Sequence, residues 1–241
     1  MNTETNVKQL DEVNKEGIGK ELEIYTNRFS PEQEKVRNET WEVLVDDFFS
    51  KYLKPTDVVL DIGAGDGLFI TKIKTKERIA VDLSSHVMNL EKSGVKVYQI
   101  PATELSKHLP EAPDVIFMSN FLEHLPDKKI LMDVLSECFK VLKKGGKIMI
   151  LQPNIRYVGV KYWDYVDHHI ALTEFSLVEG LMVNGFKVKE VIPQFLPYTA
   201  KSNLGSIGAL LPTKMLIKTY LSFPILWKFF GAQTFVVAEK P

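Results

Sequence analysis

The sequence predicts an α/β protein that is built on a parallel sheet buried on both faces. The segment from Val58 to Leu60 is continuously apolar, as expected of a strand that is covered on both sides. A glycine-rich turn follows this strand, and further apolar runs alternate with helical patterns along the chain. The 241 residues are 45% hydrophobic, which is enough for one such domain with a full core, alone or with a small cap.

The composition excludes several classes of protein. The net charge of −1 gives no overall argument for nucleic-acid binding. The single cysteine, Cys138, excludes an intramolecular disulfide and a cysteine-based zinc site, and its helical context predicts a buried thiol. Because the first residues are polar and acidic and no apolar run reaches about 18 residues, we expect no signal peptide, no membrane span and a cytoplasmic protein.

A polar segment, residues 1–24, precedes the predicted domain of residues 25–241. Ser30 stands before a proline, with Gln33 three residues further on, which is a typical helix start. The spacing of apolar residues extends this helix to Tyr52.

The strand that begins at Val58 ends in a turn of alternating glycines. Gly63, Gly65 and Gly67 permit a tight turn and a close backbone approach to a ligand, and Asp61 lies two residues before them. The spacing is not that of a dinucleotide fingerprint or a phosphate loop, and the carboxylate suits a cationic or amine-bearing ligand. If residues 68–74 begin a helix, the arrangement forms a nucleoside cradle; the alternative is a turn that only joins strand to helix.

A second strand is predicted at residues 78–84, where Asp82 and Leu83 follow the apolar run. A carboxylate at this position can accept hydrogen bonds from both hydroxyls of a ribose. Asp82 also lies about twenty residues beyond the glycine turn, the separation typical of ribose-binding acids.

The pattern Asp61-x-Gly63-x-Gly65-x-Gly67 resembles the first motif of the class I S-adenosylmethionine-dependent methyltransferases. The resemblance implies a Rossmann-like, seven-stranded, mostly parallel sheet with helices on both faces and an antiparallel last strand. It also implies that the turn, Ala64 included, packs against the methionine and ribose of the cofactor, with Asp82 on the ribose and Leu83 near the adenine. Because Asp82 would equally serve a nicotinamide-dependent oxidoreductase, that class remains an alternative, although the glycine spacing argues against it.

The same resemblance assigns roles to two residues that precede the first helix. In related methyltransferases an N-terminal helix covers the cofactor, and a nearby tyrosine or arginine binds its carboxylate. Tyr25 and Arg28 are the candidates here, and the alternative for Arg28 is an ordinary surface arginine.

Further strands are predicted at residues 95–100 and 114–120. The second of these should end beside the first strand, which places Ser119 and Asn120 at the cofactor edge. Glu123 and His124 come next; we interpret them as ordering a turn beneath the cofactor, with His124 as a base the alternative.

A helix at residues 127–144 and a strand at 147–151 lead to an aromatic segment, residues 157–169, that should face the substrate. Its last residues, His168 and His169, are the candidate catalytic bases, because an imidazole takes up a proton near neutral pH. Two adjacent histidines need a further ligand to hold a metal, and although Asp164 and Asp167 could serve, no metal is predicted.

After a helix at residues 173–184 and a strand at 186–194, the last strand is predicted at 233–239. Residues 196–231 intervene, with four lysines, no acid and many aromatic and aliphatic side chains. This segment is predicted either to cap the substrate site or to lie on the inner membrane surface.

Together these features predict a methyltransferase that uses S-adenosylmethionine and acts on a small-molecule or lipid-linked glycan acceptor, at a hydroxyl. No nucleic-acid partner is predicted, and the oligomeric state stays open. A catalytically silent protein that binds the cofactor or a membrane is the remaining alternative.

Overall fold

The computed structural model describes residues 30–198 and 212–241. In this part of the chain, one seven-stranded sheet has the order β3-β2-β1-β4-β5-β7-β6. All neighbouring strands are parallel except β7, which runs antiparallel to both β5 and β6. The mostly parallel sheet and its antiparallel last strand are therefore confirmed. The strands are β1 (Val58–Ile62), β2 (Glu77–Val81), β3 (Lys96–Tyr98), β4 (Val115–Ser119), β5 (Lys147–Pro153), β6 (Lys187–Ile192) and β7 (Gln233–Glu239).

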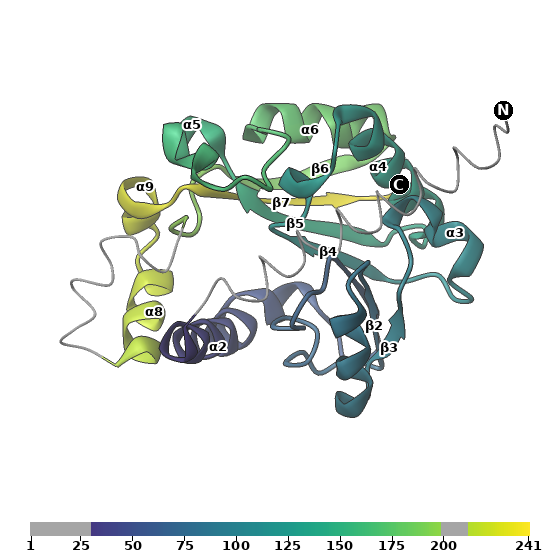
Figure 1. Ribbon diagram of the computed structural model, residues 1–241, viewed down its shortest axis with the longest axis horizontal. Coiled ribbons are helices and arrows are strands. Elements are labelled where there is room, and N and C mark those ends of the chain that lie inside the picture. The colour runs from purple at the N-terminus through teal and green to yellow at the C-terminus, as the bar shows by residue number, and fades with distance from the viewer. Residues whose placement is uncertain (1–29, 199–211) are drawn as a thin grey trace, which may run out of the picture.

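Helices cover both faces of the sheet, as Figure 1 shows. On one face lie α3, α4 and α6, and on the other α2 and α8. The alternation of a strand divides the core between the two faces, so that Leu60 packs on the α4 side and Val59 on the α2 side. The helices are α2 (Pro31–Asp47), α3 (Leu105–His108), α4 (Lys128–Val141), α5 (Ile155–Val158), α6 (Glu174–Val183), α8 (Thr213–Ser222) and α9 (Trp227–Phe230).

The strand order reverses between β1 and β4. Strand β1 pairs with β2 on one side and with β4 on the other. The chain continues from β1 to β2, toward one edge strand of the sheet, and from β4 to β5, toward the other edge strand. Ligands of open α/β sheets bind outside the carboxyl ends of the strands at such a point. The glycine turn follows β1 at this position.

Two predicted helices differ from the structure. Residues 68–72 form hydrogen-bonded turns instead of a helix, and residues 73–74 have no regular secondary structure. The hydroxyl and the backbone N–H of Thr71 both donate to the carbonyl oxygen of Gly67, at 2.6 and 3.0 Å, but the turns end there and only a short stretch of chain remains before β2 begins. Helix α2 has the predicted capping box at Ser30 but ends at Asp47, and a separate 3₁₀ turn, η1 (Phe49–Tyr52), follows. Phe48 leaves helical geometry there and stacks on Phe195, with ring centroids 4.1 Å apart.

In the segment between β6 and β7, helix α8 lies against α2 (Figure 1). Two of its prolines stand at the starts of short helical elements, since Pro212 precedes α8 and Pro224 begins a 3₁₀ turn, η7 (Pro224–Leu226). Tyr220 of α8 is buried and donates its hydroxyl to the carbonyl oxygen of Phe195, at 2.6 Å. Among the described residues no helix is both long and apolar enough to cross a membrane. Residues 199–211 of the predicted cap and the whole of 1–24 lie outside the described part.

Candidate functional site

The three glycines of the turn after β1 all have left-handed backbone angles, with φ of +68°, +50° and +69° at Gly63, Gly65 and Gly67. Two of them are also required by packing, because a Cβ on Gly63 would lie 2.5 Å from Phe121 and one on Gly67 would lie 2.6 Å from Leu90. At Gly65 a Cβ would meet no described atom within 4 Å. The middle glycine therefore borders open space at the carboxyl edge of the sheet.

Asp82, directly after β2, holds this turn in place. One of its carboxylate oxygens accepts the backbone N–H of Gly65 and the other accepts that of Ser84, both at 2.8 Å. Each oxygen keeps a further lone pair for another donor. Leu83 is about half exposed beside it.

Asp61, at the end of β1, is buried. Burial raises the pKa of its carboxyl well above the ordinary value of 3.8, and the negative charge of Asp82 adds to the rise, against a hydrogen bond from the backbone of Ile70. The carboxyl groups of Asp61 and Asp82 are therefore close enough to affect each other's charge.

The end of β4 has an unusual backbone. Asn120 has a φ of +48°, and no other residue apart from glycine has a positive φ in residues 30–198 and 212–241. Its side-chain amide donates to the Ser119 hydroxyl, at 3.1 Å, and its backbone N–H donates to the carbonyl oxygen of Leu151, at 2.9 Å. Asparagine tolerates this conformation better than most residues, and the cost is about 1–2 kcal/mol.

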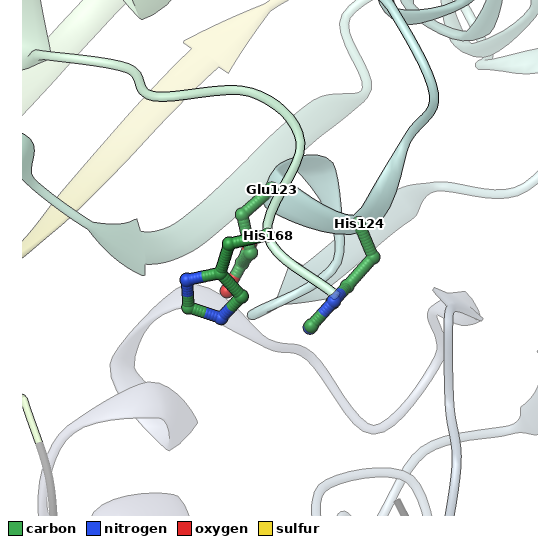
Figure 2. Close-up of side chains that lie close together, drawn as sticks. All are labelled: Glu123, His124 and His168. Carbon is green, nitrogen blue, oxygen red and sulfur yellow. The ribbon is translucent and has the colours of Figure 1, made fainter. Parts of the chain in front are cut away.

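A second group of polar side chains lies in the loops beyond β4 and β5. Glu123 and His124, in a 3₁₀ turn, η4 (Leu122–His124), meet His168 from the loop before α6, as Figure 2 shows. The backbone carbonyl of Glu123 accepts the N–H groups of His169 and Ile170, at 2.8 and 3.2 Å, so the two loops are joined directly.

The Glu123 carboxyl is 3% exposed, and one of its oxygens has no hydrogen-bond partner among the described residues. Burial raises the pKa of this carboxyl to about 8, and the nearby charge of Asp167 contributes to the rise, although the residue's own backbone N–H opposes it. Burial at this position therefore favours the neutral form of the carboxyl.

Both imidazoles in this cluster are oriented by backbone carbonyls. Nδ1 of His124 lies 2.9 Å from the carbonyl oxygen of Asp167, and Nδ1 of His168 lies 2.9 Å from that of Tyr162. The Tyr198 hydroxyl also lies 3.5 Å from Nδ1 of His168. A ring whose Nδ1 donates to a carbonyl keeps its lone pair on Nε2. The two rings meet edge to face, with centroids 5.1 Å apart.

The structure separates the two histidines proposed from the sequence. His168 is buried in the cluster, whereas the side chain of His169 is exposed. The association of His168 with Glu123 and His124 was missed, because it depends on how the two loops meet; the Leu-Glu-His sequence directly after an apolar strand was the available signal. Tyr25 and Arg28 lie outside the described residues.

Three kinds of comparison with known proteins agree with this fold. A family model described as a methyltransferase domain matches residues 33–191. A ubiquinone biosynthesis O-methyltransferase of Pseudomonas fluorescens is 32% identical over 100 residues, and one of Pseudomonas putida is 31% identical over 123 residues. These matches cover 37% and 43% of this chain, and the chain spans 41% and 50% of the relatives' lengths.

Solved structures match over most of the chain. A methyltransferase from Archaeoglobus fulgidus that depends on S-adenosylmethionine has a TM-score of 0.63 at 23% identity, with coverage of 91% of this chain and 98% of that one. The N-methyltransferase NodS from Bradyrhizobium japonicum, in complex with S-adenosylhomocysteine, has a TM-score of 0.54 at 12% identity, with coverage of 88% and 89%. At these identities the likeness shows the fold alone.

The family model decides between the two enzyme classes that Asp82 leaves open, since it spans more than half of the chain and is not that of an oxidoreductase. It includes the glycine turn, Asp82 and the loop after β4. The chain belongs to the class I S-adenosylmethionine-dependent methyltransferases.

Proposed function

We propose that this protein transfers the methyl group of S-adenosylmethionine to a hydroxyl of a small-molecule or lipid-linked glycan acceptor. One observation carries the proposal. Phe121 packs against Gly63 of the glycine turn, and the loop that begins with Phe121 continues into Glu123 and His124, which contact His168. A buried imidazole therefore lies beside the site that suits the methyl donor.

The residues around the glycine turn fit this donor. S-adenosylmethionine carries an ammonium group and two ribose hydroxyls, and the carboxyl groups of Asp61 and Asp82 complement them. An ammonium beside Asp61 would favour its charged form, which burial and Asp82 now oppose. The open space at Gly65 leaves room for the ligand against the backbone, with Ala64 next to it and Leu83 available to an adenine ring. Ser119 and Asn120 end the neighbouring strand at the same edge.

Methyl transfer from S-adenosylmethionine mainly requires the enzyme to align the reactants. A sulfonium methyl has a good leaving group, so the enzyme mainly aligns nucleophile, methyl and sulfur and excludes water. A hydroxyl nucleophile must also lose a proton. His168 is the better candidate to accept it, because it is buried and its Nδ1 is fixed by the carbonyl of Tyr162, whereas His169 is exposed.

Two observations support the proposed acceptor, a hydroxyl of a small molecule or lipid-linked glycan. The curated relatives are named for O-methylation, which favours a hydroxyl. Several apolar side chains are more than half exposed in the loop after β5 and in the segment before β7, among them the five named below. Both segments join the carboxyl edge of the sheet, where the N–H of Asn154 donates to the carbonyl of Ala232 (Figure 1). These five are Val160, Trp163, Val166, Phe223 and Phe229. Such a surface suits a lipid-linked acceptor and a peripheral membrane contact.

The donor is tested by calorimetric titration of the protein with S-adenosylmethionine and, in parallel, with NAD. We expect binding of S-adenosylmethionine alone, lost in Asp82→Ala. Binding of neither ligand would refute the donor assignment.

The catalytic assignment is tested by transfer of a labelled methyl group to extracted small molecules and lipids. We expect His168→Ala to lose transfer while keeping donor affinity, with His169→Ala as the neighbouring comparison. Unchanged transfer in both variants would exclude His168 and His169 as the base, and donor binding without any transfer would favour a catalytically silent protein.

A further inference from the structure

We propose that Gln152, together with the carboxyl of Glu123, recognises an uncharged polar group of the methyl acceptor, a hydroxyl or a carbonyl next to the hydroxyl that is methylated. This role deepens the proposed function and rests on it. Among the described residues, four buried side-chain nitrogen and oxygen atoms have no hydrogen-bond partner, and they belong to Glu123, Gln152 and Gln233. All three residues lie where β4 and β5 end, at the edge where ligands of open α/β sheets bind.

Gln152 and Glu123 lie on the same side of the sheet, beside the proposed base. Along β5, Ile148 and Ile150 belong to the core on the α4 side, and Gln152, two residues further on, faces that side too. The turn η4, which contains Glu123, lies against β5. One carboxyl oxygen of Glu123 lies within 4.8 Å of a ring nitrogen of His168 (Figure 2). A group bound by Gln152 and Glu123 would therefore lie close to the reacting hydroxyl.

The burial of these two side chains is not explained by a structural role. Gln152 is 2% exposed, and neither its amide nitrogen nor its amide oxygen has a partner among the described residues. A buried polar group without a partner destabilises a fold, so an apolar side chain would serve a purely structural position better. A ligand that supplies the missing hydrogen bonds explains why a glutamine stands here. Because its amide is enclosed, the loop after β5 must move outward to admit the acceptor.

The chemistry of the two side chains favours an uncharged group. A carboxamide carries no charge and offers both a carbonyl acceptor and N–H donors. Burial favours the neutral form of the Glu123 carboxyl, which can then donate one hydrogen bond as well as accept others. The nearby charge of Asp167 would repel an anion, and the apolar Leu122 and Ile170 next to Glu123 do not stabilise a buried ion of either sign. A hydroxyl or carbonyl of a sugar or of an aromatic ring suits this environment.

The melting temperature tests whether Gln152 has a structural partner. Gln152→Met keeps the length of the side chain and removes the unpartnered amide, so it should raise the melting temperature by about 2 °C or more. Gln233→Met is the matched control, because Gln233 is also buried but its Nε2 donates to the carbonyl oxygen of Pro197, at 2.7 Å. Loss of that bond should lower the melting temperature. A lower melting temperature for Gln152→Met would overturn the proposal, because the amide would then have a structural partner such as a buried water.

Transfer of a labelled methyl group tests recognition of the acceptor. A dilution series of extracted small molecules and lipids, with saturating S-adenosylmethionine, gives the amount of extract needed for the half-maximal rate. Gln152→Met and Glu123→Met should each raise that amount by more than about tenfold and leave the donor affinity unchanged. Glu123→Gln keeps neutral donor and acceptor atoms, so it should stay within about threefold of the wild type. An unchanged value in Gln152→Met would overturn the proposal, and a tenfold loss in Glu123→Gln would refute recognition of an uncharged group.

A binding measurement separates this outcome from that of the proposed function. Immobilised protein is exposed to the same extract, and the compounds that it retains are identified by mass spectrometry, which also distinguishes sugars from aromatic acceptors. We expect Gln152→Met to retain at least tenfold less of the compounds that the wild type binds. Methyl transfer by the wild type with equal retention by the variant would refute only the role of Gln152. Retention that depends on Gln152, without methyl transfer, would refute only the proposed reaction.

Discussion

Gly65 offers the sharpest test of the donor site, because Gly145 provides a matched control. Both glycines have left-handed backbone angles, with φ of +50° and +74°, and at both a Cβ would meet no described atom within 4 Å. They lie at opposite edges of the sheet, since Gly65 follows the carboxyl end of β1 and Gly145 precedes the amino end of β5. Replacement of either glycine by alanine therefore has the same backbone cost. The two variants differ only in whether the new methyl group lies beside the proposed donor site.

The expected loss of stability is similar for the two variants. Placing a Cβ in the left-handed region costs about 1–2 kcal/mol. For a chain of 241 residues, each kcal/mol lowers the melting temperature by about 2–4 °C, so both Gly65→Ala and Gly145→Ala should melt about 2–8 °C below the wild type. Neither variant introduces a clash with the protein, unlike Gly63→Ala, whose Cβ would lie 2.5 Å from Phe121.

The expected effect on ligand binding differs. A methyl group on Gly65 projects into the space proposed for the donor, so the affinity for S-adenosylmethionine should fall at least tenfold, which is about 1.4 kcal/mol or more. Gly145→Ala should keep the wild-type affinity. Thermal unfolding followed by circular dichroism and calorimetric titration of the two variants measure both quantities. Equal affinities in the two variants would refute the placement of the donor against the turn.

Three further predictions concern buried polar groups. The pKa of Asp61 is raised in the folded protein, so protonation of this carboxyl stabilises the fold. The contribution is complete below about pH 4, the pKa of the unfolded chain, and is lost as the pH rises through the pKa of the folded protein. The side chain of Asp61→Asn stays neutral, so its free energy of unfolding, measured by urea titration, should fall less than that of the wild type as the pH rises above about 4. The same dependence of the free energy of unfolding on pH in both proteins would contradict this. Tyr220→Phe removes the hydrogen bond to the Phe195 carbonyl and should lower the free energy of unfolding by about 1–3 kcal/mol in the same assay, with no loss counting against the contact. Cys138 is fully buried and its pKa is raised by burial, so iodoacetamide should label it only in unfolding concentrations of urea, and labelling of the native protein would disprove its burial.

The strands were predictable because their signal is local. Each buried strand is an apolar run bounded by turn residues, and β7 was found with both ends correct. Residues 68–74 show the limit of such reasoning. They follow a glycine turn as the start of a helix would, and the backbone N–H of Thr71 donates to the carbonyl oxygen of Gly67, but the turns do not continue into a helix before β2 begins. The end of α2 was misplaced for a tertiary reason, since Phe48 leaves the helix to stack on Phe195.

The candidate site divides in the same way. The glycine turn and Asp82 could be identified from spacing, because a turn and a strand end carry their own sequence signals. The cluster of Glu123, His124 and His168 could not, because it forms only where the loops after β4 and β5 meet. That meeting follows from the pairing of β4 with β5, which sequence separation does not reveal.

The position of β7 affects how this protein folds during its synthesis. Residues 233–239 pair with both β5 and β6, so an interior strand of the sheet leaves the ribosome after all the other strands. Until then, the growing chain exposes one edge of β5, and β6 has no strand to pair with. An unpaired strand edge can associate with other chains. We therefore expect the nascent protein to remain prone to aggregation until β7 has left the ribosome, even if the glycine turn has already formed.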